Sequence, residues 1–526
     1  MRLHLSILLT ILGCCHVANG LRILAIFPLN GRSHWITGQA LTMGLARRGH
    51  QVDVVSHFPQ KKPVPNYRDI SLDGTLEPVI NSMNASMVRN VGGQDFELFV
   101  RTLGTKICAL LEHEKIQQLI HNPPKDPPYD LVIVELFMFP CFLGFGRHLN
   151  VPMVGVMAST FHDWVSDVTG NMFNPSFMPC LFSPYRPEMT FYERLMNTVL
   201  TNLVGMQLKY YMRMEDEYVK KHFNIDESVM ELHKDLAVIL VNSHHSLNGV
   251  KPMTNGVIEI GGLHITEQGD PLSPEIQKWL DESTHGCVYF TLGSMVRIET
   301  YPESVQRAFL NAFESIAPVR VLMKVAHKED LIPKVPKNVM VQSWFPQVSV
   351  FKHKNIKAFV THGGTMSIQE AVYFGIPMVG IPLFGDQPTN MNNVAHLNIA
   401  VSLGSLKNVT EETLSYSLNK VLTDKTYQEN MKRISKLFKD RPMTAMDTAV
   451  YWVEYAARNG NALRSPAIRL RWWQQQLFDV YGFILACLAL ALYVVIFVLR
   501  KLTCLLFGSK ACSKKPSHSS ESKKRK

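Results

Sequence analysis

Cysteine is scarce in this chain, and its distribution excludes a disulfide-rich fold. Nine cysteines occur in 526 residues. Two of them lie within the first 20 residues, and three lie in or after the last apolar segment. The remaining four are widely separated: Cys108, Cys141, Cys180 and Cys287. Small domains held by disulfides space their cysteines closely, so one bridge is possible here and none is required.

Net positive charge is also scarce, except at one end of the chain. The net charge is +10, but residues 500–526 contain nine lysines or arginines and a single acid, Glu521. The rest of the chain is nearly neutral. A nucleic-acid-binding protein carries basic residues across a folded surface, so this composition does not favour that class. Internal repeats and low-complexity blocks are also lacking before residue 500.

Long apolar runs occur at only two places. Arg2 precedes an apolar run over residues 3–17, and small residues follow it. Residues 1–20 are therefore predicted to be a secretory signal peptide. Residues 477–499 are apolar apart from Asp479, and this length suffices for a single transmembrane helix that anchors the chain in a membrane.

The flanks of the second run predict its orientation. Trp472 and Trp473 suit one membrane interface, and the basic residues Arg500 and Lys501 suit the other. The positive flank places residues 500–526 in the cytosol as a basic tail. The body is then lumenal, which is a single-pass type I topology.

Two further signals agree with a lumenal body. Asn84 and Asn408 begin N-glycosylation sequons that a lumenal chain could use. Lys523 and Lys524 resemble a dilysine signal for return to the endoplasmic reticulum, which predicts residence in that membrane. The alternative is a generic polybasic tail that contacts anionic lipid.

Between these ends, short apolar runs alternate with helical patterns. Strands are predicted at 22–27 and 52–56, with a helix over 34–48 between them. The same alternation continues through a helix over 96–120 to strands at 131–134 and 153–156. A strand, a helix and a strand in this order imply a parallel βαβ unit, so the first half is predicted to be a doubly wound α/β domain.

The second half repeats this alternation. Strands are predicted at 288–292, 320–324 and 339–341, and helices over 411–437 and 445–458. The predicted division is therefore a first domain at 21–240, a linker at 241–265, a second domain at 266–445, and a returning helix with a juxtamembrane segment at 446–470. The helical stretch 190–223, rich in Met, Leu and Tyr, is either a core helix pair or a surface that rests on a membrane.

The most informative stretch runs from Trp344 to Gln387. A strand is predicted at 358–361, a tight turn at His362–Gly364, a helix over 365–374 and a strand at 378–381. Gly375 and the proline two residues later end the helix. The N-terminus of this helix and the histidine of the turn suit an anionic group such as a phosphate.

The polar side chains of this stretch fit a sugar nucleotide. The stretch contains hydrogen-bond donors for a diphosphate and acceptors for ribose or sugar hydroxyls. It also contains an aromatic ring that could stack on a base and a side-chain amide that could pair with the edge of the base. The candidate donor-binding residues are Trp344, Gln347, His362, Gly364, Ser367, Glu370, Asp386 and Gln387. For a lone H-G-G turn, an ordinary loop before a helix is the simpler interpretation.

The complete string resembles the signature of the UDP-glycosyltransferases. It contains W-x-P-Q, F-V-T-H-G-G, S-x-x-E, G-x-P and P-x-x-x-D-Q at the family's spacings. The resemblance implies a GT-B fold, which is an α/β architecture of two facing Rossmann-like domains, here with a C-terminal single transmembrane helix. Ligands of open parallel sheets bind outside the carboxyl ends of the strands, so both sets of loops would border one cleft.

The resemblance also implies a catalytic base. His34, in S-H-W after the first strand, stands where the family has its base, and the adjacent helix dipole disfavours a charged imidazolium. Many relatives place an aspartate behind this histidine. This chain has Glu135, whose extra methylene shifts the carboxylate by about 1 Å. The alternative is that His34 begins the helix without a catalytic task.

The expected reaction is an inverting, metal-independent transfer. Because no D-x-D pair occurs, a metal that bridges the diphosphate is not indicated, and no cofactor is expected beyond the UDP-sugar co-substrate. Ser294 in L-G-S resembles the family's phosphate-contacting serine. Lys251, where relatives often have arginine, and Met366, where some have asparagine, depart from the family pattern.

The expected activity is hexose transfer to small lipophilic hydroxyl compounds, as in detoxification. Three sequence segments resemble insect members of the family most, and they favour UDP-glucose as the donor. These segments are YFTLGS, LVNSHHSLN and IEIGGLHI. The acceptor would bind loops near 85–125 and 160–200. One alternative function is a non-catalytic protein that binds UDP-sugar or lipophiles, and another is a sugar-nucleotide epimerase of the same fold. The sequence is also compatible with a homo-oligomer.

Overall fold

The computed structural model describes residues 20–91, 96–265 and 269–507 of the chain. These residues belong to two compact units, one that ends at Ser465 and one that begins at Pro466. The predicted signal peptide lies outside the described residues apart from Gly20. Most of the predicted basic tail, including the dilysine pair, lies outside them as well.

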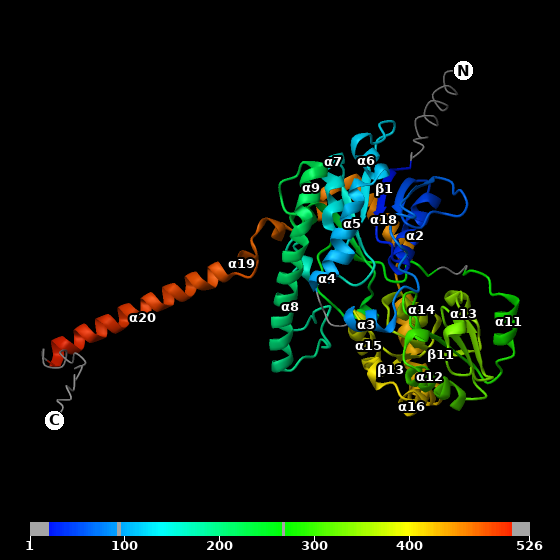
Figure 1. Cartoon of the computed structure of the whole chain (residues 1–526). Coiled ribbons are helices and arrows are strands. Elements are labelled where there is room, and N and C mark those ends of the chain that lie inside the picture. The colour runs from blue at the N-terminus through cyan, green and yellow to red at the C-terminus, as the bar shows by residue number, and fades with distance from the viewer. Residues whose placement is uncertain (1–19, 92–95, 266–268, 508–526) are drawn as a thin grey trace, which may run out of the picture. The chain divides into compact units, whose positions relative to one another are not determined.

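The first half of the larger unit is built on a seven-stranded parallel sheet (Figure 1). The strand order is β3-β2-β1-β4-β5-β6-β7. The strands are β1 (Arg22–Phe27), β2 (Gln51–Ser56), β3 (Tyr67–Ser71), β4 (Leu131–Glu135), β5 (Met153–Met157), β6 (Leu236–Val241) and β7 (Val257–Glu259). The strands β4, β5 and β6 are fully buried, as expected for a sheet covered by helices on both faces.

The second half contains a six-stranded parallel sheet of order β10-β9-β8-β11-β12-β13. Its strands are β8 (Cys287–Thr291), β9 (Arg320–Lys324), β10 (Val339–Gln342), β11 (Ile356–Thr361), β12 (Met378–Gly380) and β13 (Ala400–Ser402). In both sheets the order reverses beside the first strand, between β1 and β4 and between β8 and β11. Loops that leave the carboxyl ends of strands at such a reversal diverge and leave space for a ligand.

Helices connect and cover these strands. Those of the first half are α2 (Arg32–Arg47), α3 (Ala85–Val91), α4 (Phe96–Val100), α5 (Lys106–Cys108), α6 (Glu114–His121), α7 (Gly144–Leu149), α8 (Phe191–Met212), α9 (Asp216–Phe223) and α10 (His245–Asn248). Those of the second half are α11 (Pro274–Asp281), α12 (Glu303–Ser315), α13 (Gln347–Lys352), α14 (Thr365–Phe374), α15 (Gln387–His396), α16 (Glu411–Thr423), α17 (Lys425–Lys439) and α18 (Ala445–Asn459).

The single helix predicted over residues 96–120 is wrong in detail. It is divided into α4, a π-helical turn at Arg101–Thr105, α5, a 3₁₀ turn and α6. The chain leaves helical geometry at His113, which has an extended backbone and caps α6 with its side chain. Apolar periodicity continues across the break, which explains why the sequence did not reveal it.

The interval 241–265, predicted to be a plain linker, contributes structure of its own. It contains α10 and β7, and β7 pairs in parallel with β6 to complete the first sheet. A strand of three residues has too few positions for its alternation to be recognised in the sequence.

The last helix of the larger unit returns to the first half. In Figure 1, α18 (orange) lies beside α2. Arg48 pairs with Asp447, and the Nε2 of His50 lies 3.1 Å from a carboxylate oxygen of Glu454. Met446 occupies the space that a side chain at Gly44 would fill.

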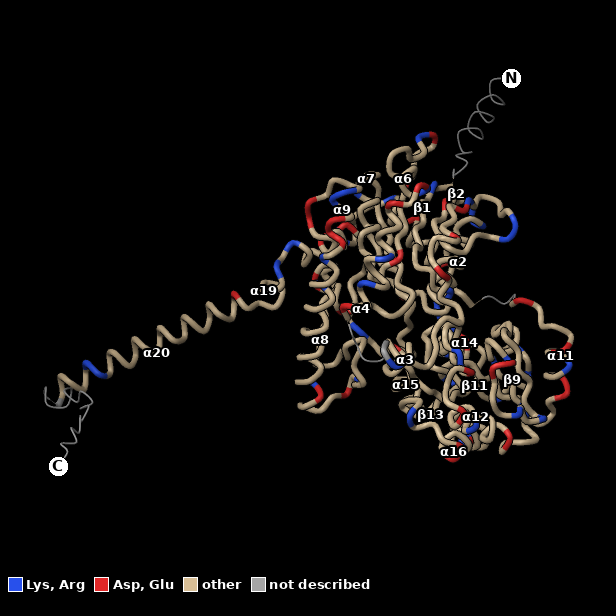
Figure 2. Tube along the Cα trace, in the orientation of Figure 1, with Lys and Arg blue, Asp and Glu red and all other residues tan. Residues whose placement is uncertain are grey.

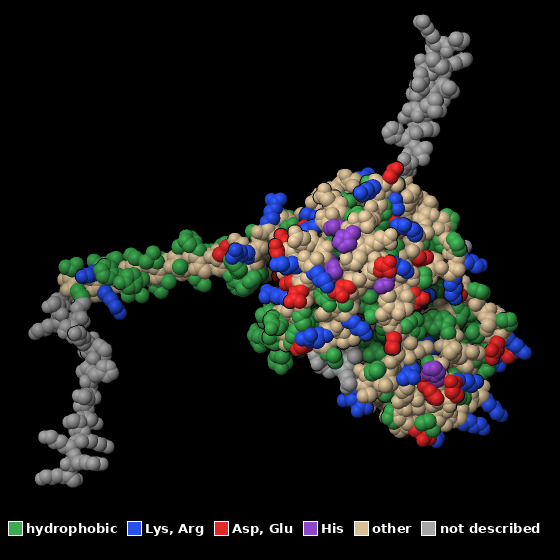
Figure 3. All heavy atoms as spheres, turned by 45° about the horizontal axis from the view of Figure 1, so that its top comes forward, with side chains coloured by type: hydrophobic (Ala, Val, Ile, Leu, Met, Phe, Trp, Pro, Cys, Tyr) green, Lys and Arg blue, Asp and Glu red, His purple; other side chains and the backbone are tan. Residues whose placement is uncertain are grey.

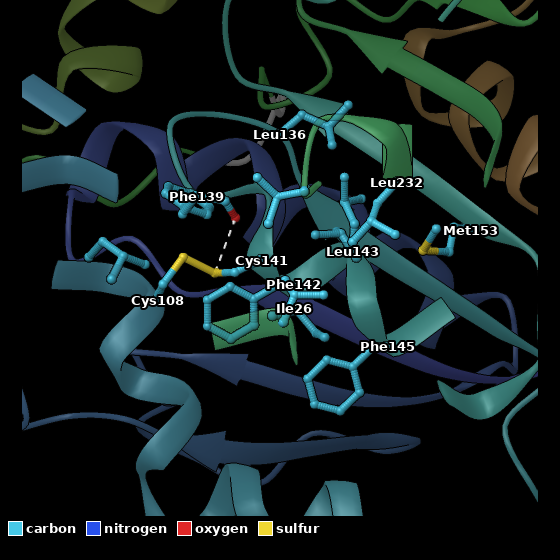
Figure 4. Close-up of a cluster of buried hydrophobic side chains, with 14 of the residues drawn as sticks. Ile26, Cys108, Leu136, Phe139, Cys141, Phe142, Leu143, Phe145, Met153 and Leu232 are labelled. Atoms are coloured by element: carbon cyan, nitrogen blue, oxygen red, sulfur yellow. Dashed lines mark hydrogen bonds between the residues drawn. A yellow bond between two sulfur atoms is a disulfide. The ribbon is translucent and has the colours of Figure 1, made fainter. Parts of the chain in front are cut away.

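One disulfide lies in the core of the first half. Cys108 of α5 bonds to Cys141, in the turn after β4, and both are fully buried (Figure 4). The sequence left the pairing of the four body cysteines open. This bond fixes the α4–α5 segment to the segment that follows Glu135.

The smaller unit consists mainly of α20 (Phe478–Phe507), preceded by α19 (Trp472–Gln475). The apolar span Phe478–Leu506 is long and apolar enough to cross a membrane. Along α20, Figure 2 shows an acidic residue near the start and basic residues toward the end. These are Asp479, Arg500 and Lys501.

Candidate active site

The first half contributes a histidine–carboxylate pair. His34 lies in the first turn of α2, directly after β1, and Glu135 is the last residue of the neighbouring strand β4. The Nδ1 of His34 lies 2.7 Å from the Oε1 of Glu135. The Glu135 side chain is 2 % exposed and that of His34 is 24 % exposed. A carboxylate on Nδ1 fixes the tautomer with the proton there, which leaves Nε2 with a free lone pair.

A row of packed rings extends from His34. The ring of Phe137 packs edge-on against His34 at 4.8 Å, and the ring of His162 lies 6.0 Å from that of Phe137. His162 stacks on Trp164 and its Nε2 is 3.0 Å from the hydroxyl of Ser159. Burial, with the nearby His34, lowers the pKa of His162 to about 3. His162 is therefore a neutral hydrogen-bonding group near the pair.

The second half contributes a histidine in a different setting. His362 follows β11 in the turn before α14, and both Gly293 and Gly364 lie close to the Cε1–Nε2 edge of its ring. A Cβ at Gly293 would lie 2.7 Å from the ring, and one at Gly364 would lie 2.9 Å from it. Gly293 also has φ +86°, which favours glycine. Glycine is thus required for the approach of these backbones to the imidazole.

The protonation of His362 follows from this packing. Its Nδ1 is buried and has no hydrogen-bond partner among the described residues. Burial and the nearby Lys324 lower the pKa of His362 to about 4. A neutral imidazole with an unsatisfied nitrogen at a helix N-terminus is suited to donate to an anionic ligand.

Lys324 was not anticipated from the sequence. It is the last residue of β9, and its Nζ donates to the carbonyl of Gly293 at 2.9 Å and to the Oδ1 of Asn81 at 2.8 Å. Its Nζ also lies 6.0 Å from the centre of the exposed ring of Trp344. No carboxylate of the described residues forms an ion pair with it, and burial lowers its pKa to about 8. The sequence feature that could have identified Lys324 as a site residue is its position, a cation at the carboxyl end of a buried parallel strand.

Three of the predicted donor-binding residues form one hydrogen-bonded cluster. The Nε2 of Gln347 donates to the carboxylate of Glu370 at 2.5 Å and to the hydroxyl of Ser367 at 3.2 Å. The other carboxylate oxygen of Glu370 lies 3.2 Å from the Nε2 of His264. Gln347 begins α13, whereas Ser367 and Glu370 lie on α14.

The two residues predicted to hold the sugar lie at the start of α15, next to the first residue of α14. Asp386 accepts from the hydroxyl of Thr365 and from the Nδ2 of Asn390, both at 2.8 Å. Gln387 is buried, and its Oε1 accepts from the backbone N–H groups of Leu383 and Phe384. The side-chain oxygen of Gln387 therefore stabilises the loop before α15. Its side-chain nitrogen could donate to a ligand.

The two halves meet around these groups. The hydroxyl of Thr37, one turn after His34, lies 3.6 Å from the sulfur of Met366, at the start of α14. Gln369 of α14 donates to the carbonyl of Asn242 and accepts from the N–H of Gly262. The N-terminal turns that carry the two histidines are thus brought close to each other.

A segment of the first half also crosses to the second. The N–H of Asn81 donates to the carbonyl of Ser294 at 2.8 Å, and Met83 forms a parallel bridge with Val296. Val88 of α3 is buried in the hydrophobic core of the second half. The loop at Ser294, predicted to contact phosphate, is therefore held by both halves.

The two predicted glycosylation sites precede helices: Asn84 lies directly before α3, and Asn408 ends a 3₁₀ turn before α16. Asn84 precedes α3, and its Oδ1 accepts from the N–H of Met87 at 2.9 Å. Asn408 is exposed and donates to the carbonyl of Leu403 at 2.7 Å.

One group of potential metal ligands occurs among the described residues: Cys108, Cys141 and Glu215. The two sulfurs are joined in the disulfide, so they are not available as thiolates. Burial raises the pKa of Glu215 well above its usual range, which favours a neutral acid beside the disulfide. This group lies in the core and contains none of the predicted site residues.

Comparison with known proteins places this arrangement in a family. The family model described as UDP-glucoronosyl and UDP-glucosyl transferase matches residues 98–517. UDP-glucosyltransferase 2 of Dactylopius coccus is 36% identical over 493 residues, which cover 92% of this chain and 94% of that protein. UDP-glucuronosyltransferase 2A3 of Mus musculus is 28% identical over 498 residues, with 89% and 91% covered.

The fold agrees with a solved structure. The crystal structure of the glycotransferase of kitacinnamycin matches with a TM-score of 0.52 at 16% identity, covering 82% of this chain and 97% of that one. The two Rossmann-type sheets, each with a strand-order reversal, are those of a GT-B glycosyltransferase. The chain therefore belongs to the UDP-glucuronosyl and UDP-glucosyl transferase family.

Proposed function

We propose that this protein transfers glucose from UDP-glucose to a hydroxyl of a small lipophilic acceptor, with inversion and without a metal. The observation that carries the proposal is the 2.7 Å contact between His34 and Glu135 beside the N-terminal turn of α14. A relative named UDP-glucosyltransferase 2, at 36% identity, supports glucose as the sugar.

The first half supplies the base. Glu135 holds the proton of His34 on Nδ1, so that Nε2 can accept the proton of the acceptor hydroxyl. The acceptor oxygen then forms a bond to the anomeric carbon while the bond from that carbon to the diphosphate oxygen breaks. Glu135 stabilises the resulting imidazolium because it is a buried carboxylate in direct contact with the ring.

The second half holds the leaving group. The negative charge that develops on UDP would meet the N-terminus of α14, the neutral imidazole of His362 and the ammonium of Lys324. Ser294, in the loop after β8, and Ser367, in the first turn of α14, add hydroxyl donors. These groups supply the positive potential for which other transferases use a metal ion.

The nucleoside end of the donor would bind further along the same helix. Glu370 is suited to accept from ribose hydroxyls, and Trp344 offers an exposed face for the uracil ring. The side-chain amide of Gln347, which contacts Glu370, would pair with an edge of the base. Glu370 is already bonded to Gln347, so donor binding would exchange part of that contact for contacts to the ribose. Asp386 and Gln387 would hold the sugar hydroxyls.

Membrane attachment and orientation complete the proposal. The apolar span of α20 would anchor the protein in the membrane of the endoplasmic reticulum, with the body in the lumen and the basic tail in the cytosol. Asn84 and Asn408 would then be available for glycosylation.

The test is a screen of UDP-sugars against phenolic and aliphatic alcohols, on microsomes that contain the chain, with His34→Ala as the control. We expect UDP release with UDP-glucose that requires both an acceptor and His34. Binding of UDP-glucose without transfer to any acceptor, and without a difference between the chain and His34→Ala, would instead support a non-catalytic binding protein.

A further inference from the structure

His264 is a buried histidine in the segment that leads from the first half of the body to the second. This crossing segment, residues 261–265, follows β7. Figure 3 shows histidine side chains at a few places on the surface, where water can bond to them. The His264 side chain is only 2% exposed, and neither of its ring nitrogens forms a hydrogen bond with a described residue. Buried polar groups are usually hydrogen-bonded, so this imidazole requires an explanation.

The crossing segment is fixed on both sides of His264. Leu263 is buried in a hydrophobic core of the first half, and Ile265 packs against a core of the second half. The N–H of Gly262 donates to the side-chain oxygen of Gln369 on α14 at 2.9 Å. The position of His264 against α14 is therefore set by the packing of both halves.

The imidazole of His264 faces Glu370, the residue after Gln369 on α14. The Nε2 of His264 lies 3.2 Å from the Oε1 of Glu370, whose side chain is 10% exposed. The Oε2 of Glu370 accepts from Gln347 at 2.5 Å. Among the described residues, no lysine or arginine forms an ion pair with this carboxylate. The carboxylate thus lies between an amide of the second half and an imidazole of the crossing segment.

The carboxylate determines where His264 carries its proton. The Nδ1 of His264 has no partner among the residues that the structure describes, so no competing contact selects the other tautomer. A carboxylate oxygen beside Nε2 favours the proton on that nitrogen. The contact lacks the alignment of a hydrogen bond. Because the last torsion of a glutamate side chain is broad, a small rotation of the Glu370 carboxylate aligns it.

A donor behind Glu370 would matter for ligand binding. A carboxylate that accepts from two neighbouring hydroxyls must present both oxygens in one plane, whereas an unsupported carboxylate turns about its last torsion. A hydrogen bond on the side away from the ligand restricts that rotation before the ligand arrives. Such preorganisation lowers the entropic cost of binding.

We infer that His264 is a positioning residue for ribose recognition, which rests on the proposed role of Glu370 as acceptor for the ribose hydroxyls. When the donor binds and Gln347 pairs with the base, Glu370 exchanges the bond to Gln347 for bonds to the ribose. The hydrogen bond from His264 stays and fixes the plane of the carboxylate. A carboxylate oxygen can accept twice, so Oε1 can serve His264 and a ribose hydroxyl together.

The experiment compares two nucleotides on the full chain in detergent micelles by calorimetric titration. UDP carries both ribose hydroxyls, whereas dideoxy-UDP lacks both and keeps the base and the diphosphate. His264→Phe removes the donor and keeps a flat ring, and His264→Gln keeps an N–H donor. His233→Phe is the control for the loss of a buried imidazole, since His233 is buried in the first half.

We expect the unaltered chain to bind UDP about 10²-fold more tightly than dideoxy-UDP, since two hydrogen bonds to a carboxylate are lost. In His264→Phe this ratio should fall about tenfold, with an unchanged affinity for dideoxy-UDP. His264→Gln and His233→Phe should keep most of the ratio. The ratio of two affinities does not depend on how much of a variant folds.

An unchanged ratio in His264→Phe would overturn the inference. An equal loss of affinity for both nucleotides would overturn it as well, because it would show a structural role alone. Glu370→Ala should already lose the ratio, and a further fall on adding His264→Phe would show that the imidazole does not act through Glu370. Equal binding of both nucleotides by the unaltered chain would instead contradict the proposed role of Glu370, and the inference with it.

Discussion

The two halves of the molecule place a histidine at equivalent positions and give it opposite surroundings. His34 and His362 each follow a central strand and each lies at the start of the next helix. His34 has a buried carboxylate at 2.7 Å and an accessible edge. His362 has glycines against its ring, a lysine nearby and no carboxylate contact among the described residues.

This difference shows that the fold determines where each histidine lies, whereas the neighbouring side chains determine what each imidazole can do chemically. A carboxylate on one nitrogen prepares the other to accept a proton. Burial beside a lysine keeps an imidazole neutral, so its N–H can donate a hydrogen bond to a phosphate oxygen while the ring carries no charge. The first arrangement suits a base and the second suits a phosphate contact.

The largest expected effect comes from removing the carboxylate that distinguishes His34. Glu135→Gln keeps the size of the side chain but does not stabilise the imidazolium, so we expect transfer to slow by about 10²–10³-fold. Affinity for UDP should stay unchanged if, as we propose, the donor binds the other half. Glu135→Asp should retain more activity than Glu135→Gln in single-turnover assays, and equal losses would contradict a role for the negative charge.

The next effect comes from disturbing the packing of His362. Gly293→Ala adds a Cβ 2.7 Å from the imidazole at a φ of +86°. Gly375→Ala is a matched control, since Gly375 has φ +75° and open space around its Cβ. Both changes should lower the free energy of unfolding by about 1–2 kcal/mol through the backbone.

Only Gly293→Ala should also weaken UDP binding, because it displaces the ring of His362. Calorimetric titration of UDP against both variants separates the two effects. Equal UDP affinity in both would show that the ring does not contact the donor.

A smaller effect is expected from Lys324. Lys324→Met keeps the stem but removes the buried ammonium, and we expect UDP affinity to fall by about tenfold, which corresponds to about 1.4 kcal/mol. Lys407→Met, at an exposed site on the same half, is the control. An unchanged affinity in Lys324→Met would limit this lysine to its hydrogen bonds with Asn81 and Gly293.

The smallest effect is a pH dependence of UDP affinity. Burial lowers the pKa of Lys324 to about 8, so the ammonium is present below pH 8 and is lost above it. The affinity for UDP should therefore fall as the pH rises above about 8, with proton uptake on binding visible in buffers of different ionisation enthalpy. His362, with a pKa of about 4, stays neutral throughout this range. Lys324→Met should show no such slope.

Local rules predicted the region around His362 well. The predicted helix 365–374 coincides with α14, and Gly375 is its left-handed C-cap residue. A strand, a glycine turn, a helix and a capping glycine each have a local signal, so their sum could be predicted without knowledge of the rest of the chain.

Contacts between distant segments could not be predicted in this way. The hydrogen bonds of Asn81 with Ser294 and Lys324 join residues that are more than 200 positions apart in the sequence. The helix break at His113 and the disulfide from Cys108 to Cys141 depend on how several elements pack. Neither has a periodic signal, since each is decided by tertiary structure.

One paired measurement tests most directly whether His34 acts as the base and His362 binds UDP. UDP affinity and the single-turnover transfer rate are measured on His34→Ala and on His362→Ala. We expect His34→Ala to bind UDP as the unaltered chain does and to transfer at least about 10²-fold more slowly. His362→Ala should bind UDP more weakly. If His34→Ala loses UDP affinity, or if it transfers at the original rate, the assignment of the two histidines is contradicted.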